Sequence, residues 1–461
     1  MMAGNQNTLN KLETKLDSFD LTTRQTALQE LMALVNASDM HLPPKKEIAN
    51  LHCHTFFSYN TFGFSPTHIA WLGKKLGIKF MGIVDFDVLD GVDEFLEACR
   101  ITGICGSAGM ETRAYIPELS TCVINSPGEP GISYHMGIGF SSNKTNPTTK
   151  DNLYAIRNRV HQRNHDLFER IKRHLKPLEL DYERDVVPLT PAGNVTERHM
   201  VAVILEKSLQ ETNNPNAFWG KKLNLDQHDI QEKMKDTSAF KNLLRKKLMK
   251  RGSVGYKQPT KDTFPLIDEV NRVIQDCSAL PCIAWLDGTS DGEQAIDELL
   301  ELMVDKGAVT LNIIPDRNWN INDAEIKHIK LNNLYKIIKY ANQANLPIIV
   351  GTEMNSDGQV MVDNFNSPEL KPLTESFIYG ACFIYGHTQM QSIWKMGYQS
   401  QWTHAQFNQR KNKNDFYVQA GRLIPPNIKT EAVKNHLDEK MTPSQVISQL
   451  KLISGDINEY I

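Results

Sequence analysis

The sequence predicts an α/β protein whose strands and helices alternate along the chain and form a parallel sheet or barrel. Between Ile48 and Phe140, and again after Phe264, short apolar runs of strand character alternate with amphipathic stretches of helical spacing. Strands separated by helices of this length pair in parallel, because the helix returns the chain to the same edge of the sheet. Several apolar runs also end in a histidine or an acidic residue, and the carboxyl ends of barrel strands meet at one rim.

The first part of the chain contains a helical arm and then the start of this alternation. Residues 8–47 have the pattern of two amphipathic helices, the second with an N-cap at Asp20 or Thr22. Ser65 and Pro66 are a favourable N-cap and N1 pair for the next helix. The elements expected after it are a strand at Lys79–Val84, a helix at Gly91–Ile101, and strands at Thr121–Asn125 and Ile132–Phe140.

The alternation is interrupted after residue 140 by a polar, helix-rich segment that carries a basic run at residues 245–251, and we interpret this segment as an insertion. After the insertion we expect helices at Ile267–Cys277, Gln294–Lys306 and Leu331–Asn345, strands at Pro281–Trp285, Ala308–Ile314 and Pro347–Gly351, and a strand-like run at Ala381–Tyr385. The predicted organisation is a helical arm (1–47), a barrel (48–140 and 263–390), a helical insertion (141–262) and a helical C-terminal extension (391–461).

Composition indicates a cytoplasmic globular protein. The 461 residues are 40% hydrophobic and 23% charged, with a net charge of -3, so no overall positive field attracts nucleic acid or membrane. No apolar run is long enough to span a bilayer, and the first residues do not resemble a signal peptide. The seven cysteines are scattered, as is typical of reduced core thiols.

His52 and His54 form the most informative local pattern. Side chains at positions i and i+2 of a strand point to the same side, so both imidazoles can bind one metal ion. Cys53 lies between them and is expected to face away from the metal and pack behind the site. Polar residues end four later strand-like runs: Asp85 and Asp87, Glu111, His135, and Glu353.

With these residues in this order, the chain resembles the polymerase and histidinol phosphatase (PHP) family over residues 48–140 and 263–360. The resemblance implies a distorted (β/α)7 TIM-like barrel with as many as three metal ions at its C-terminal rim. The insertion also resembles the segment of phosphoesterase members that contains threonine, arginine and histidine, at residues 194–199. The matching segments are LHCHTFFSYN (51–60), GIVDFDVLDG (82–91), SAGMETRAYI (107–116), YHMGIGF (134–140), LPCIAWLDG (280–288) and IVGTEMNSDG (349–358).

Four positions depart from the metal-ligand pattern of that family, and they are occupied by Asn60, Phe86, Trp285 and Asn355. Three of the departures fall on histidines associated with a single metal position, which implies that one whole site has been lost. The resemblance leaves a smaller site with one or two divalent ions, Mn, Zn or Fe. The implied ligands are His52, His54, Glu111, His135 and Glu353, with Asp287 or water completing the weaker position.

The implied activity is hydrolysis of a small phosphorylated molecule by water that the metal activates. Asp85 is expected to accept the N–H of His52 or His54 and so to fix its tautomer. Arg113 would hold phosphate oxygens. Arg198 and His199 of the insertion would add substrate contacts, with His199 protonating the leaving group.

Other functions remain open from the sequence. The same metal site would also serve hydrolysis of a C–N or ester bond. A catalytically silent barrel that acts as a binding or scaffold module is another possibility, because folds survive the loss of their chemistry. A nuclease ranks third, since only the basic run at residues 245–251 offers a groove for nucleic acid. The N-terminal arm would either cap the barrel or mediate a homo-oligomer.

Overall fold

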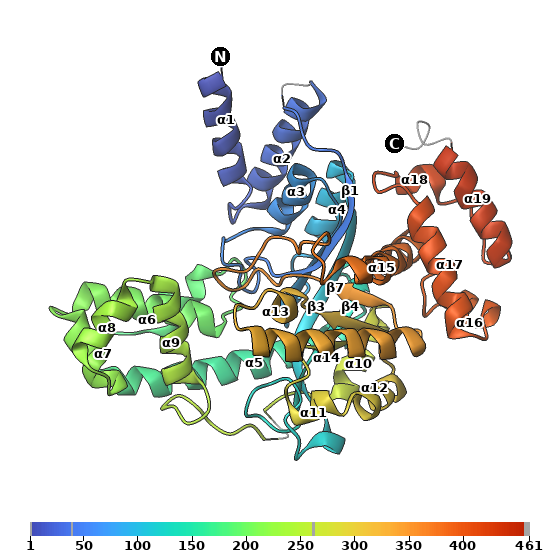
Figure 1. The fold of residues 1–461 in the computed structure, drawn as a ribbon. Helices are drawn as coiled ribbons and strands as arrows, with labels where there is room; N and C mark the ends of the chain where they lie inside the picture. The colour runs from blue at the N-terminus through green and yellow to red at the C-terminus, as the bar shows by residue number, and fades with distance from the viewer. Residues whose placement is uncertain (1, 38–39, 261–262, 456–461) are drawn as a thin grey trace.

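The protein is built around one mixed α/β barrel (Figure 1). The computed structural model describes residues 2–37, 40–260 and 263–455. Within these residues the strands form one seven-stranded sheet in sequence order. The strands are β1 (Lys46–Cys53), β2 (Ile78–Phe86), β3 (Cys105–Tyr115), β4 (Ile132–Phe140), β5 (Leu280–Trp285), β6 (Thr310–Ile313) and β7 (Ile348–Val350).

The last strand meets the first at the rim that carries the candidate site. Cys53 and Glu353 form an isolated parallel bridge. The Glu353 amide donates to the carbonyl of His52 at 2.7 Å, and the His54 amide donates to the carbonyl of Glu353 at 2.8 Å. This bridge closes the sheet and fixes Glu353 against the two histidines.

β4 is the exception to the predicted parallel order, because it is antiparallel to both β3 and β5. The segment between β3 and β4 holds only the short 3-10 helix η1 (Pro117–Leu119) among its described elements, so no crossover returns the chain to the same edge. The strand predicted at residues 121–125 is wrong. Asn125 in this loop instead donates to the carbonyl of Ala284 and accepts from the amide of Tyr134, both at 2.7 Å.

Helices surround the barrel, and the predicted start of one of them is confirmed. The side chain of Ser65 accepts the amide of His68 at 3.0 Å, and Pro66 is the first residue of α3. The run at residues 381–385, predicted to be strand-like, lies instead in a buried helix, α15. An apolar run without a period does not distinguish a strand from a buried helix. The surrounding helices are α3 (Pro66–Leu76), α4 (Val92–Thr102), α10 (Ile267–Asp276), α11 (Asp291–Gln294), α12 (Ile296–Asp305), α13 (Asp316–Trp319), α14 (Ala324–Gln343) and α15 (Thr374–Trp394).

The N-terminal arm consists of α1 (Met2–Lys15) and α2 (Leu21–Asn36), which lie beside α3 and α4 (Figure 1). Asp20 caps α2 by accepting the amide of Thr23 at 2.7 Å. The arm is tied to the barrel by hydrogen bonds such as that from Trp71 to Glu13, at 2.8 Å. The arm therefore covers one side of the barrel, while the predicted oligomer stays a prediction.

The inserted segment has a hydrophobic core of its own, in which Phe168, Trp219 and Phe240 are almost completely buried. Its predicted last residue, 262, lies outside the described residues. Its helices are α5 (Pro147–His174), α6 (Glu197–Glu211), α7 (Pro215–Leu223), α8 (Gln227–Met234) and α9 (Thr237–Met249), with η2 (Tyr182–Val186) and η3 (Val187–Leu189) between α5 and α6.

The C-terminal segment is helical, as predicted, and it packs on α15 through α17 (Figure 1). Its elements, with the short helix that precedes α15, are η4 (Lys371–Leu373), α16 (Gln401–Gln406), α17 (Arg410–Leu423), α18 (Thr430–Val433) and α19 (Pro443–Gly455). None of the helices in the described ranges is long and apolar enough to cross a membrane.

Candidate metal centre

Three side chains converge at the barrel rim: His52 and His54 at the end of β1, and Glu111 on β3. All three residues are buried, with at most 4% of their surface exposed. The Nε2 atoms of His52 and His54 lie 3.4 and 3.3 Å from the Glu111 Oε2. The two-residue spacing on β1 places both imidazoles on one face, as the sequence predicts.

His52 is held in one orientation by Asn312 on β6. The Nδ1 of His52 lies 3.0 Å from the Asn312 Oδ1, and the Asn312 Nδ2 donates to the carbonyl of Ile349 at 3.3 Å. Because the amide nitrogen is committed to that carbonyl, the Asn312 oxygen faces the imidazole and accepts its Nδ1–H. The Nε2 of His52 therefore presents a lone pair towards Glu111.

His54 is held in the same tautomer through Ser58, which lies between it and Asp85. The Ser58 hydroxyl donates to the Asp85 Oδ1 at 2.6 Å, which leaves its oxygen to accept the His54 Nδ1–H at 3.2 Å. Asp85 also accepts the amide and the hydroxyl of Thr55, at 2.7 and 2.6 Å. The prediction that Asp85 contacts a histidine directly is wrong, because its oxygens bind the loop after β1.

The two Nε2 atoms and the Glu111 Oε2 have no hydrogen-bond partner within the described part of the chain. Two lone pairs aimed at a carboxylate oxygen repel it unless a cation lies between them. Burial raises the pKa of Glu111, but its contacts with His52 and His54 outweigh burial and lower it to about 2. Burial lowers the pKa of His52, and the Glu111 carboxylate outweighs this and raises it. Two imidazoles and one carboxylate with free lone pairs fit a divalent metal such as zinc.

Glu353, the remaining predicted acidic ligand, lies at the same rim but already has partners. Its Oε2 accepts the Arg317 Nη2 at 2.6 Å and the Gln359 Nε2 at 2.8 Å. Glu353 has a φ of 63°, and Met354 after it has a φ of 55°. Two successive residues in the left-handed region turn the chain sharply after β7, so that the carboxylate faces the cavity.

His135 does not join the centre, so its predicted role as a metal ligand is wrong. In the pairing of β3 with β4, Glu111 lies opposite Met136, and His135 lies opposite Thr112. His135 therefore points to the other face of the sheet, where its Nε2 lies 2.6 Å from the Asn271 Oδ1 on α10. Burial lowers its pKa to about 4. Tyr134, one residue earlier, lines the cavity instead.

Of the four positions that depart from the family pattern, three contact the residues around the centre and one points away from it. Phe86 stacks on His54 with 4.2 Å between ring centroids, so an aromatic ring occupies that side of the imidazole. Asn60 donates to the carbonyl of His54 at 2.8 Å, and Asn355 accepts from Arg198 at 3.4 Å. Trp285 pairs with Ile313, one position beyond the pair of Ala284 with Asn312, so alternation turns it away from the metal centre.

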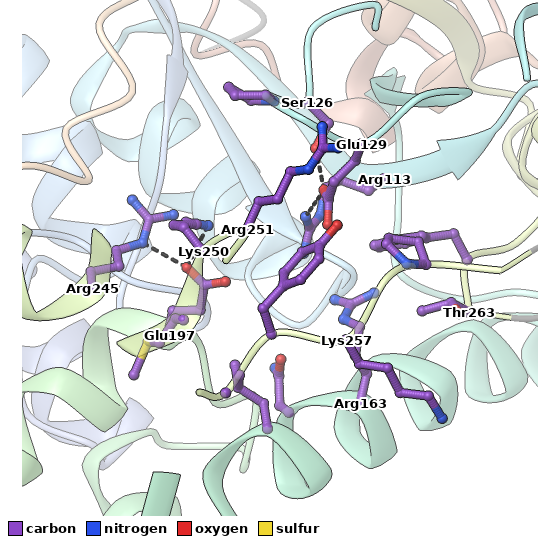
Figure 2. A pocket seen from close by; sticks show the side chains of 18 of the residues that line it. Arg113, Ser126, Glu129, Arg163, Glu197, Arg245, Lys250, Arg251, Lys257 and Thr263 are labelled. Carbon is purple, nitrogen blue, oxygen red and sulfur yellow. Dashed lines mark hydrogen bonds and ion pairs between the residues drawn. The ribbon is translucent and has the colours of Figure 1, made fainter. Parts of the chain in front are cut away.

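The metal centre opens into a cavity of about 1260 Å3 that lies between the barrel and the insertion. Arg113 lines this cavity and donates to the Glu129 carboxylate at 2.8 Å (Figure 2), while its predicted binding of phosphate stays a prediction. Arg163 of α5 also lines it, and the guanidinium carbons of Arg113 and Arg163 lie 4.7 and 4.4 Å from the ring centre of Phe264. Burial and the neighbouring Arg113 lower the pKa of Arg163 to about 10. Within the described residues its Nη1 is buried without a hydrogen-bond partner.

Arg198 and His199 of the insertion were both predicted to bind substrate, but they lie in different surroundings. Arg198 lines the cavity, with its guanidinium 5.7 Å from the ring centre of Tyr59. His199 instead caps α6, because its Nδ1 accepts the amide of Thr196 at 3.1 Å. Burial lowers its pKa to about 4, which leaves it neutral near pH 7. Unlike Arg198, His199 is not among the described residues that line the cavity, so the prediction that it protonates a leaving group is wrong.

A second ionic cluster, not predicted from the sequence, lies in the same cavity around Glu197. Its carboxylate accepts Arg245 at 2.6 Å and Lys250 at 2.7 Å (Figure 2). Burial and the nearby cations lower the pKa of Lys250 to about 8, although Glu197 acts in the opposite direction. The basic run at residues 245–251 therefore faces the cavity from α9 and the residues after it.

Sequence reasoning missed three residues at the centre. Asn312 was visible as a polar residue within an apolar strand, and Ser58 as a hydroxyl four residues after His54. Arg317 follows β6, and nothing in its surrounding sequence distinguishes it from a surface arginine.

Comparison with known proteins adds little to this geometry. The sequence matches no family model and no curated protein. One similar solved structure is an amidohydrolase from Chromobacterium violaceum with bound sulfate and no metal; it is 14% identical with a TM-score of 0.46 over 71% of this chain and 96% of that chain. Another, from Bifidobacterium adolescentis, is described as a candidate metal-dependent phosphoesterase; it is 16% identical with a TM-score of 0.46 over 73% of this chain and 98% of that chain. Neither likeness is close enough to assign an activity.

Proposed function

We propose that this protein is a metal-dependent hydrolase of the PHP phosphoesterase type that acts on a small phosphorylated molecule. The observation that carries the proposal is the convergence of three buried atoms without hydrogen-bond partners, within the described residues, beside a large cavity that Glu111 lines. Leaving such atoms unpaired costs about 1–3 kcal/mol each. A scaffold would gain nothing from this arrangement, whereas a divalent metal satisfies all three atoms together.

The charge of the cavity supports an anionic substrate. Among the described residues that line it, twelve carry arginine or lysine side chains and five carry carboxylates, although the whole chain has a net charge of -3. Concentrating positive charge in a cleft raises the local concentration of anions. The insertion contributes ten of these cations, namely Arg159, Arg163, Arg170, Arg198, Arg245, Lys246, Lys247, Lys250, Arg251 and Lys257.

The chemistry follows from the fit between the centre and a metal. When bound, a divalent metal lowers the pKa of water and polarises a phosphoryl oxygen. His52, His54 and Glu111 would hold it, and three protein ligands leave a position open for water or substrate. Arg113 lines the same cavity, and its guanidinium has further N–H donors for phosphate oxygens beside its bond to Glu129.

Elemental analysis of the purified protein beside a His52→Ala/His54→Ala variant tests the metal site. We expect bound Mn, Fe or Zn in the parent, with loss of that metal from a variant that remains folded by circular dichroism. The metal-loaded parent is then screened against phosphate monoesters, with release of inorganic phosphate as the readout. A folded parent that takes up no supplied metal would refute the hydrolase proposal and favour the scaffold.

A further inference from the structure

Arg317 lies beside the metal centre, outside the three-residue cluster. It belongs to α13 (labelled in Figure 1), which begins shortly after β6 in the sequence. The Arg317 side chain is 40% exposed, whereas that of its partner Glu353 is 7% exposed. Both residues line the cavity that Glu111 also lines. The ion pair therefore presents its positive side to the cavity.

The carboxylates of Glu111 and Glu353 at this rim differ in their hydrogen-bond partners. The Glu111 Oε2 is buried with no hydrogen-bond partner among the described residues, and a metal ion shared with His52 and His54 would satisfy it. The Glu353 Oε2 already accepts two donors, from Arg317 and Gln359. A carboxylate oxygen with two such donors needs no metal to satisfy it.

We infer that the centre is built for one metal ion, and that Arg317, held by Glu353, supplies the second positive charge that binds oxygens of the anionic substrate. This inference rests on the proposed hydrolase function and adds to it the means by which the anion is held. The described residues offer one group of three metal-ligand atoms, His52, His54 and Glu111, and the Phe86 ring that stacks on His54 at 4.2 Å adds no ligand to it.

Arg317 has donors to spare for this role. A guanidinium carries five N–H groups in a planar fork that matches phosphate oxygens. Within the described part of the chain, the Arg317 side chain makes one hydrogen bond, from Nη2 to Glu353. The donors that remain, on an exposed side chain beside Glu111, can bind two substrate oxygens without breaking the bond to Glu353.

The backbone around Arg317 is fixed before any substrate binds. The Arg317 amide donates to the carbonyl of Ile314 at 3.2 Å. The side chain of Asn318 donates to the carbonyls of Ile314 and Leu286, at 3.0 and 2.9 Å. Because β6 also carries Asn312, the strand that orients His52 leads directly to Arg317. A guanidinium placed in advance loses little entropy when it binds an anion.

The test measures metal content and anion binding separately. Parent, Arg317→Met, Arg317→Lys and Glu353→Gln proteins are stripped of metal, reloaded with zinc or manganese, and assayed for bound metal by elemental analysis. Binding of inorganic phosphate to each loaded protein is then measured by calorimetry. Arg100→Met is the matched control, because Arg100 does not line the cavity, is 38% exposed, and pairs with Glu97 at 2.6 Å.

We expect one equivalent of metal in the parent and in all variants. Arg317→Met should weaken phosphate binding about tenfold, since it removes charged hydrogen bonds, and Arg317→Lys should restore part of the loss. Arg100→Met should bind phosphate as the parent does. Two equivalents in the parent, with one lost in Glu353→Gln, would overturn the inference, as would unchanged phosphate binding in Arg317→Met. No metal in the parent would instead overturn the proposed hydrolase function, so the two failures are distinguishable.

Discussion

Replacing Asn312 by leucine should weaken metal binding without removing any metal ligand. Asn312 accepts the Nδ1–H of His52 at 3.0 Å, and both residues are at most 2% exposed. Without that acceptor, the Nδ1–H is buried and unpaired, which costs about 1–3 kcal/mol. His52 avoids this cost by moving its proton to Nε2, but Nε2 then has no lone pair for the metal.

Metal binding through Nε2 then requires the proton to return to the unpaired Nδ1 position, so binding is opposed by as much as that free energy. Since about 1.4 kcal/mol corresponds to a factor of ten, we expect the dissociation constant to rise roughly 10- to 100-fold. The assay is a competition titration of zinc between the protein and a chromophoric chelator, with circular dichroism melts to establish that each variant is folded. Asn312→Asp keeps the acceptor and should retain tight binding.

Asn271→Leu is the matched control. Asn271 is 3% exposed, its Oδ1 lies 2.6 Å from the His135 Nε2, and its Nδ2 donates to a backbone carbonyl at 2.7 Å. The Asn271→Leu variant therefore loses the same kind of buried contact, but on the outer face of the sheet. The metal affinity of this variant should equal that of the parent. Parent-like affinity in Asn312→Leu, or equal losses in the two leucine variants, would refute the assignment of Asn312 as the residue that orients His52.

Three further outcomes are expected. In the metal-free protein, the raised pKa of His52 stabilises the fold fully below pH 6.5, and the lowered pKa of Glu111 stabilises it fully above pH 4.5. In thermal melts, stability should therefore fall as pH rises through the folded pKa of His52. It should also fall as pH decreases towards about 2, the folded pKa of Glu111. Bound metal should remove the loss of stability at high pH. Ser58→Ala should weaken zinc binding about tenfold in the chelator assay, because it disconnects His54 from Asp85. His199→Ala should lower the free energy of unfolding by about 1 kcal/mol in urea titrations, through loss of the α6 cap, and leave metal content unchanged.

Each of these outcomes can fail on its own. A flat alkaline limb in the metal-free protein would mean that Glu111 does not hold a proton on His52. Unchanged zinc affinity in Ser58→Ala would show that the His54 tautomer is fixed by something other than the hydroxyl. Loss of metal from a folded His199→Ala protein would place that residue at the centre after all.

The face that a residue occupies on a strand proved hardest to predict. His135 and Tyr134 are neighbours in the sequence, and either could have faced the centre. The pairing of Thr112 with His135 decided the matter, because a shift of one residue moves a side chain to the other face. That pairing depends on the loop between β3 and β4, which was predicted to contain a strand and does not.

The contacts of polar side chains that have hydrogen-bond partners close by in the sequence were also predicted wrongly. Asp85 was expected at a histidine but binds Thr55 and Ser58. His199 was expected at the substrate but caps its own helix. In both cases a nearby backbone or hydroxyl group satisfies the side chain, and such local competition leaves no trace in the spacing of residues.

The sequence by itself determined the alternation of strands and helices, the position of the insertion, and the placement of two imidazoles on one face of β1. These features depend on short-range periodicity, which residue types and spacing encode directly. The tertiary structure alone decided which distant groups meet those imidazoles. Asn312 reaches His52 across 260 residues of chain, and Arg317 reaches Glu353 across 36. Such contacts arise from closure of the barrel, which no local pattern encodes.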